Sequence, residues 1–195
     1  LSSFKELYRE SVIQKARSII VEGIPSSGRS ARSGPIARPA GREVALMERK
    51  VVVRQAVIGD LPRVVGLFDA YRRYFGQQSD PEGCAAFLFD RFEHLESVMF
   101  LAEEGETVRG FAHLYPSFSS LTLQRVWVLN DFFVEDGHRH LGIGVALFAA
   151  VRLYAEATLA KGIELTVEHA NVPGWKFWEK QGFALDTEFR TYFLK

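Results

Sequence analysis

The stretch LNDFFVEDGHRHLGIGVALFAAVRLYA, residues 129–155, decides the fold. An apolar strand runs to Val134, a glycine-containing loop follows, and a helix with an apolar face begins directly after it. Backbone N–H groups in the first turn of a helix have no partner within the helix, and the helix dipole favours negative charge there. Gly142 and Gly144 lack a Cβ, so an anion can approach the main chain closely. The junction therefore predicts a phosphate site, most naturally for a diphosphate.

Two common nucleotide-binding loops do not fit this junction. A Walker loop requires Gly-Lys-Ser/Thr, which the chain lacks. A dinucleotide-binding loop requires a third glycine, but Leu147 stands at that position. Taken alone, the pair of glycines is equally compatible with a simple turn from strand to helix.

Length and composition indicate one cored domain with an extension. The chain has 195 residues, too few for two comfortable domains. No apolar run reaches the roughly 20 residues that a membrane span needs, so no membrane partner is expected. The N-terminus lacks the pattern of a secretory signal. Cys84 is the single cysteine of the sequence, which fits a reducing compartment, and we expect a cytoplasmic protein.

The net charge of zero hides an asymmetry between the two parts of the chain. Residues 1–50 hold 10 Lys+Arg against 5 Asp+Glu, and residues 51–195 hold 14 against 19. We interpret residues 1–46 as an N-terminal extension, a helix over 4–22 followed by a flexible linker, and residues 47–195 as the domain. The basic extension is either a solvated tail or a contact for an anionic partner. The acidic domain favours a cationic small molecule or peptide, and no nucleic acid is expected.

The hydrophobic pattern predicts a mixed α/β domain in the order β-α-α-β-β-β-α-β-α-β-β. This order favours a largely antiparallel sheet flanked by helices and differs from the strict alternation of a doubly wound fold. The expected strands are 51–57, 97–103, 107–115, 122–134, 163–169 and two at the C-terminus. One expected helix begins near residue 60, and three others cover 81–94, 142–160 and 173–181.

Two spaced motifs resemble the GNAT superfamily of N-acetyltransferases. The first is the R-x-x-G-x-G run that starts at Arg139, directly after Asp-Phe-Phe-Val. The second is Asn171, a small residue three positions later, an aromatic residue seven positions later (Trp178), and then Gly-Phe at 182–183. The resemblance covers about residues 51–195, and the branch it resembles includes histone and polyamine acetyltransferase relatives.

The resemblance implies a GNAT-like sheet whose central strands splay apart to admit acetyl-CoA. Pantetheine would pair with the main chain of the strand before the phosphate loop. The diphosphate would lie on the loop, and the matching asparagine would contact the cofactor or order its surroundings. The implied cofactor-binding residues are Phe132, Phe133, Val134, Arg139, His140, Leu141, Gly142, Ile143, Gly144 and Asn171.

The implied reaction is direct attack of a primary amine on the acetyl thioester in a ternary complex, with no metal. Asp131 is the first candidate for the base, because a carboxylate inside an apolar strand must be paired or serve a site. Its alternative role is to hydrogen-bond backbone at a strand bulge. Glu168 is the second candidate, and its alternative is an exposed charge at a strand end. Trp178 stands where the family usually has a tyrosine acid, and an indole N–H does not serve as one.

Three functions therefore remain open at the level of the sequence. The first is an acetyltransferase that acts on an amine of a small molecule or peptide. The second is a non-catalytic acyl-CoA-binding sensory module, which Trp178 favours. The third is a protein-modifying or antitoxin-like role that uses the basic extension. A homodimer is left open.

Overall fold

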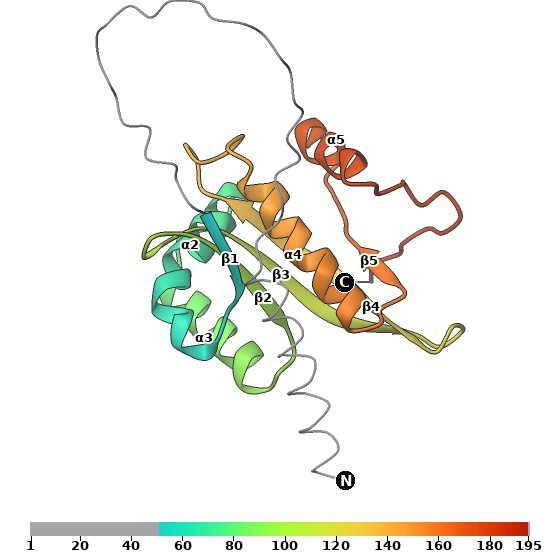
Figure 1. Ribbon diagram of the computed structural model, residues 1–195, viewed down its shortest axis with the longest axis horizontal. Coiled ribbons are helices and arrows are strands. Elements are labelled where there is room, and N and C mark those ends of the chain that lie inside the picture. Colours follow the sequence, from blue (N-terminus) through green and yellow to red (C-terminus); the bar gives the residue numbers. More distant parts are fainter. Residues whose placement is uncertain (1–50, 195) are drawn as a thin grey trace, which may run out of the picture. The chain divides into compact units, whose positions relative to one another are not determined.

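The computed structural model describes residues 51–194, and the predictions made for residues 1–46 lie outside this range. The chain falls into two units that part between Glu164 and Leu165. The first unit holds one sheet and three long helices, and the second holds helix α5 (Figure 1).

The first unit is built on a five-stranded sheet in the order β1-β2-β3-β4-β5. The first three pairings are antiparallel, and β4 pairs with β5 in parallel. The largely antiparallel sheet expected from the sequence is therefore confirmed. Its strands are β1 (Val51–Gln55), β2 (Val98–Glu104), β3 (Thr107–Ser119), β4 (Gln124–Val134) and β5 (Gly162–Glu164).

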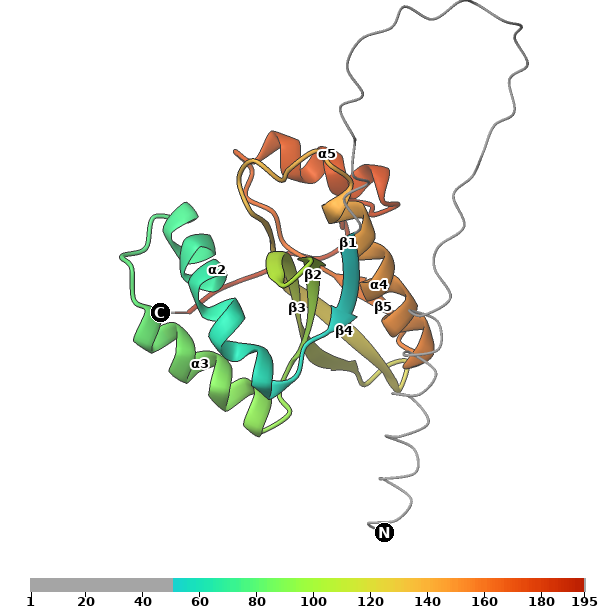
Figure 2. The ribbon, with the colours of Figure 1, turned by 60° about the vertical axis from the view of Figure 1, so that its left-hand side comes forward.

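Helices cover both faces of this sheet (Figures 1 and 2). A short turn, η1 (Ile58–Asp60), leads into α2 (Leu61–Tyr74), which packs beside α3 (Pro81–Glu93) on one face. Helix α4 (Ile143–Ala157) covers the other face. Both α2 and α3 carry proline in the first turn, where a missing N–H costs nothing. The amphipathic pattern of the sequence thus places each helix with its apolar stripe on the sheet.

The core between α2, α3 and the sheet is rich in aromatic residues. Phe68, Leu88, Leu101 and Phe111 are at most 5% exposed and belong to one cluster. Burying each such side chain contributes about 1.5–3 kcal/mol. This core fixes α2 against β3 and β4 and so determines what the α2 side chains can reach.

A charged network closes the end of the sheet where β1 meets η1. The Arg54 guanidinium donates to Asp60 at 2.6 and 2.7 Å and to Glu103 at 2.7 and 2.9 Å. The hydrogen bond from Arg54 is the largest influence holding the pKa of Asp60 below its ordinary value. Both carboxylates are buried, so the pairing meets the requirement that buried charges be compensated.

A β-bulge interrupts the pairing of β3 with β4. His113 lies opposite Asp131 and Leu114 lies opposite Leu129, which leaves Asn130 as an extra residue on β4. One extra residue exchanges the two faces of a strand beyond it. Trp127, before the bulge, contacts Tyr154 of α4, whereas Asp131, after it, contacts α2. The bulge therefore turns the side chain of Asp131 toward the α2 face.

Strands β4 and β5 share only a short register. The pairs run from Val126–Gly162 to Val128–Glu164, and β4 continues beyond them to Val134. The expected strand over 163–169 is therefore correct only at its start. This early end of the ladder fits the splayed central strands expected of the fold.

The second unit contains α5 (Val172–Lys180), close to the helix expected over 173–181. Within residues 165–194 there is no strand, so the prediction of two terminal strands is wrong. Apolar residues do recur there, but a strand needs a neighbour to complete its ladder, and this unit supplies none in its described residues. No described helix combines the length and apolar character that membrane crossing requires.

Candidate functional site

Asp131 is the hub of a buried hydrogen-bond network. Its Oδ1 accepts from the Tyr71 hydroxyl at 2.9 Å and from Asn130 Nδ2 at 3.1 Å, and its Oδ2 lies 3.1 Å from His113 Nδ1. His113 Nε2 lies 2.7 Å from Ser97 Oγ, at the turn that precedes β2. The donors come from α2, β3 and β4, so the network exists only because the bulge aims Asp131 at this face.

Aromatic rings surround the network. The Tyr71 ring packs against Phe111 and Phe133 at centroid distances of 5.7 and 5.9 Å. Burial, followed by the nearby Asp131 carboxylate, raises the pKa of Tyr71 above its ordinary value. The same two causes raise the pKa of Tyr115, whose ring lies 4.8 Å from that of His113. Both phenols therefore keep their protons at neutral pH, and that of Tyr71 donates to Asp131.

The loop before α4 has a backbone conformation suited to an anion. His140 and Gly142 adopt left-handed conformations with φ of +64° and +84°, and Gly142 is the N-cap of α4. Left-handed residues in such turns point successive N–H groups to one side. Among the described residues, no hydrogen bond uses the backbone N–H groups of 139–145. The first bond of the helix is Ala146 N–H to the Gly142 carbonyl at 3.0 Å.

The side chain of Arg139 is held by contacts with the preceding strand β4, with the loop itself and with α2. Its Nε donates to the Val134 carbonyl at 3.1 Å, and its Nη1 lies 3.0 Å from Asp136. Its Cζ lies 5.0 Å from the centroid of the Tyr74 ring and 5.5 Å from that of Phe133. These contacts fix the stem of the guanidinium and leave further N–H donors for an anion.

Comparison with known proteins identifies the family of this chain. The model of the acetyltransferase (GNAT) family matches residues 64–183. The uncharacterized N-acetyltransferase YhfO of Bacillus subtilis (strain 168) is 40% identical over 142 residues, covering 73% of this chain and 95% of that protein. The chain belongs to the GNAT acetyltransferase family. A probable acetyltransferase of Haemophilus influenzae is 36% identical over 129 residues, covering 66% of this chain and 86% of that protein.

Solved structures confirm the GNAT fold. A crystal structure of a probable acetyltransferase matches with a TM-score of 0.70 and 36% identity, covering 73% of this chain and 96% of that one. The chain is thus an acetyltransferase by family, and its fold is the one expected from the phosphate loop. The more detailed resemblance to histone and polyamine acetyltransferase relatives stays a prediction.

The first unit of this GNAT chain brings together most of the residues named from the sequence. Asp131, the strand residues 132–134 and the loop residues 139–144 follow one another from the bulge to the start of α4. Glu168 and Asn171 belong to the second unit. Glu168 is exposed, and Asn171 caps α5 by accepting from Gly174 N–H at 3.0 Å. Asn171 therefore orders its local helix start.

Trp178, the departure from the usual tyrosine, packs inside the second unit. Its ring lies 4.8 Å from Phe177 and 5.5 Å from Phe183. It is buried and serves as the apolar anchor of α5. This packing explains a large aromatic residue at the position, and it supplies no proton donor of suitable acidity.

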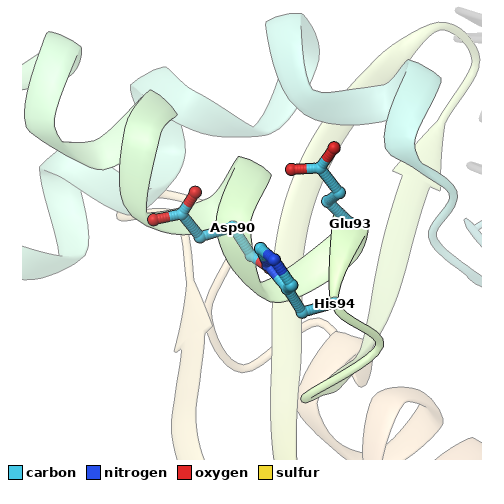
Figure 3. Close-up of side chains that lie close together, drawn as sticks. All are labelled: Asp90, Glu93 and His94. Atoms are coloured by element: carbon cyan, nitrogen blue, oxygen red, sulfur yellow. The ribbon is translucent and has the colours of Figure 1, made fainter.

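One group of potential metal ligands occurs among the described residues, at the end of α3 (Figure 3). Ligand atoms of Asp90, Glu93 and His94 lie within 4.8 Å of one another. All three side chains are exposed, and His94 Nδ1 is 2.9 Å from the Asp90 carbonyl oxygen. Exposed carboxylates gather in this way without a metal, so the cluster does not define a metal centre.

The sequence gives no site role to Tyr71 or Ser97, and it places His113 in an apolar strand, where a histidine is more often a satisfied core residue than a catalyst. His113 is indeed a satisfied core histidine, with 0% exposure and a partner on each ring nitrogen. The signal for Tyr71 was its place on the apolar stripe of α2, where a hydroxyl needs a buried acceptor. Ser97 carries no such signal, since a serine before a strand is common.

Proposed function

We propose that this GNAT protein is an acetyl-CoA-dependent N-acetyltransferase that acts on a primary amine of a small molecule or peptide. The observation that carries the proposal is the row of backbone N–H groups over 139–145, which have no acceptor among the described residues at the start of α4. Such a row, with the guanidinium of Arg139 beside it, suits the diphosphate of coenzyme A.

The main chain after the bulge would hold the rest of the cofactor. The backbone of Phe132, Phe133 and Val134 would lie along the pantetheine arm, and loop residues His140, Leu141, Gly142, Ile143 and Gly144 would cradle the phosphates. An N–H group near Phe133–Val134 would stabilise the oxyanion that develops on the thioester carbonyl. A preorganised N–H donor needs no rearrangement when the negative charge develops on the carbonyl oxygen.

Asp131 would remove a proton from the acceptor ammonium, and the neutral amine so formed would attack the thioester carbonyl directly. Three described donors occupy part of the carboxylate, and an ionised carboxylate has room for about four. One acceptor position therefore remains for the substrate. Glu168 stays the second candidate for this role, and the thiolate of coenzyme A would leave unassisted or with a proton from water.

The test is a screen of amines with acetyl-CoA that follows the release of free thiol. Asp131→Asn should lower kcat by about 10²- to 10⁴-fold, the usual contribution of a general base, while coenzyme A binding by calorimetry stays unchanged. Asp90→Asn, an exposed carboxylate on α3, is the matched control and should behave as wild type. Full turnover by Asp131→Asn would remove Asp131 as the base.

Trp178 favours a second candidate, an acyl-CoA-binding sensory module without turnover, because it leaves the second unit without the family's tyrosine. Tight coenzyme A binding combined with no thiol release from any amine would support this alternative. Lack of coenzyme A binding would refute both. The cytoplasmic location and a homodimer stay predictions.

A further inference from the structure

The network around Asp131 ends at a residue that no sequence motif includes. Ser97 Oγ lies 2.7 Å from His113 Nε2, and His113 Nδ1 lies 3.1 Å from Asp131 Oδ2. Ser97 is partly buried, whereas His113 is fully buried. The three residues come from the turn before β2, from β3 and from β4. The adjacent strands of the sheet therefore carry one chain of hydrogen bonds toward the candidate base.

The hydrogen bonds decide which tautomer His113 adopts. An ionised carboxylate only accepts hydrogen bonds, so His113 Nδ1 must carry the proton that faces Asp131. In a neutral imidazole the other nitrogen is then an acceptor, and the hydroxyl of Ser97 can donate to it. Asp131 therefore sets the tautomer, and Ser97 supplies the hydrogen bond that holds the opposite side of the ring.

Packing prevents the imidazole from turning away. The Tyr115 ring lies 4.8 Å from the His113 ring, and Phe68 meets it edge-on at 6.3 Å. Because His113 pairs directly with Asp131 across the two strands, their side chains emerge on the same face. The ring thus presents its Nδ1–H in one direction, toward the carboxylate.

We propose that Ser97 and His113 are positioning residues for acetyl transfer: Ser97 donates to Nε2 of His113 and fixes the imidazole, and His113 then donates from Nδ1 and holds the Asp131 carboxylate in the orientation that receives the amine proton. This inference rests on the proposed function, in which Asp131 is the base. Neither residue touches the substrate, and each acts through its neighbour.

A pair of substitutions with the same chemistry distinguishes positioning from simple core filling. In His113→Asn the amide nitrogen is attached to Cγ, as Nδ1 is, and can donate to Asp131. In His113→Gln the amide nitrogen stands one bond further out, toward Ser97. We expect kcat of the glutamine variant to fall about ten- to hundredfold, which is the loss typical of a displaced catalytic group. The asparagine variant should keep much of the wild-type kcat. The KM for acetyl-CoA should stay constant in both.

Ser97 is tested by Ser97→Ala and Ser97→Thr, with Ser120→Ala at the exposed hairpin tip as the control. The alanine variant should lose kcat and the threonine variant should keep it, because only threonine retains the hydroxyl. Thermal unfolding of each variant shows whether it is folded. Equal kcat for His113→Asn and His113→Gln, or wild-type kcat for Ser97→Ala, would overturn the proposal if Asp131→Asn is inactive.

A readout without turnover keeps this inference separate from the proposed function. Nitrogen-15 NMR of the wild-type protein should show His113 as the Nδ1–H tautomer, and Ser97→Ala should shift the Nε2 resonance, because that nitrogen loses its hydrogen-bond donor. An Nε2–H tautomer in the wild type would refute the positioning role even if acetyl transfer is confirmed. The hydrogen-bonded series Ser97–His113–Asp131 has the same residue types, in the same sequence, as the catalytic triad of serine hydrolases, in which the serine is the nucleophile. An acetyl group found on Ser97 by mass spectrometry would make Ser97 a nucleophile and would likewise overturn the proposal.

Discussion

Replacement of Tyr74 by alanine should weaken coenzyme A binding, although Tyr74 lies on α2 and outside the phosphate loop. The Arg139 Cζ lies 5.0 Å from the centroid of the Tyr74 ring, within the range of a cation–π contact. At a partly exposed site such a contact contributes about 0.5–1 kcal/mol. If the ring holds the guanidinium toward the diphosphate, its loss should raise the Kd about two- to fivefold.

Calorimetry with coenzyme A measures this effect directly. Tyr74→Phe keeps the ring face and should bind as wild type. Arg139→Ala removes a charge-assisted contact of about 1.5–3 kcal/mol and should raise the Kd at least tenfold. The decisive measurement is the double variant, since Tyr74→Ala should add nothing once Arg139 is absent. An equal effect of Tyr74→Ala in both backgrounds would show that the ring acts on the cofactor by another route, and the reasoning would fail.

Four further outcomes can be measured on the purified protein. Gly110→Ala should destabilise the fold by about 1–3 kcal/mol in urea unfolding, because a Cβ there would lie 2.8 Å from a backbone carbonyl oxygen of β4. Gly142→Ala should cost about 1–2 kcal/mol from its φ of +84° alone, since no atom lies within 4 Å of the added Cβ; Gly142→Asn should lose less. The pKa of Asp60 is lowered chiefly by Arg54, so the stability it contributes is present above its unfolded pKa of about 3.9 and is lost as the pH falls through the lower folded value; Asp60→Asn should remove that acid-dependent loss. Burial raises the pKa of the Cys84 thiol, so thiol reagents should modify it only as fast as the protein opens.

The strand–loop–helix structure of the candidate phosphate loop could be predicted from the sequence because it is local. The glycine at 142 takes a left-handed conformation and α4 begins at Ile143, as the strand–loop–helix pattern indicates. Such a junction depends on a few consecutive residues, and its helix start brings its own N–H donors. The order of helices and strands from residue 51 to residue 164 followed equally well, because it rests on hydrophobic periodicity.

The acceptor side could not be predicted in the same way because it depends on register. Simple alternation along β4 places Trp127 and Asp131 on one face, yet they contact helices on opposite faces. The bulge at Asn130 reverses the side-chain direction of the residues after it, and no residue type in the strand indicates a bulge at this position. The partnership of Asp131 with His113 then follows from pairing between strands, which a single sequence does not reveal. The prediction of two C-terminal strands was wrong for a related reason, because an alternation of apolar and polar residues does not show whether a neighbouring strand is present for pairing.

Helix α2 connects the two halves of the site through residues one turn apart. Tyr71 donates to Asp131, and Tyr74 stacks on Arg139, so the candidate base and the candidate phosphate ligand rest on a single helical face. The ring of Phe133, from the strand between them, touches both tyrosines. Because Tyr71 and Tyr74 lie on one rigid helix, a shift of α2 that separates Tyr74 from Arg139 would also move the Tyr71 hydroxyl away from Asp131. If Arg139 binds the diphosphate and Asp131 is the base, as proposed, a shift of α2 would therefore disturb both groups at once.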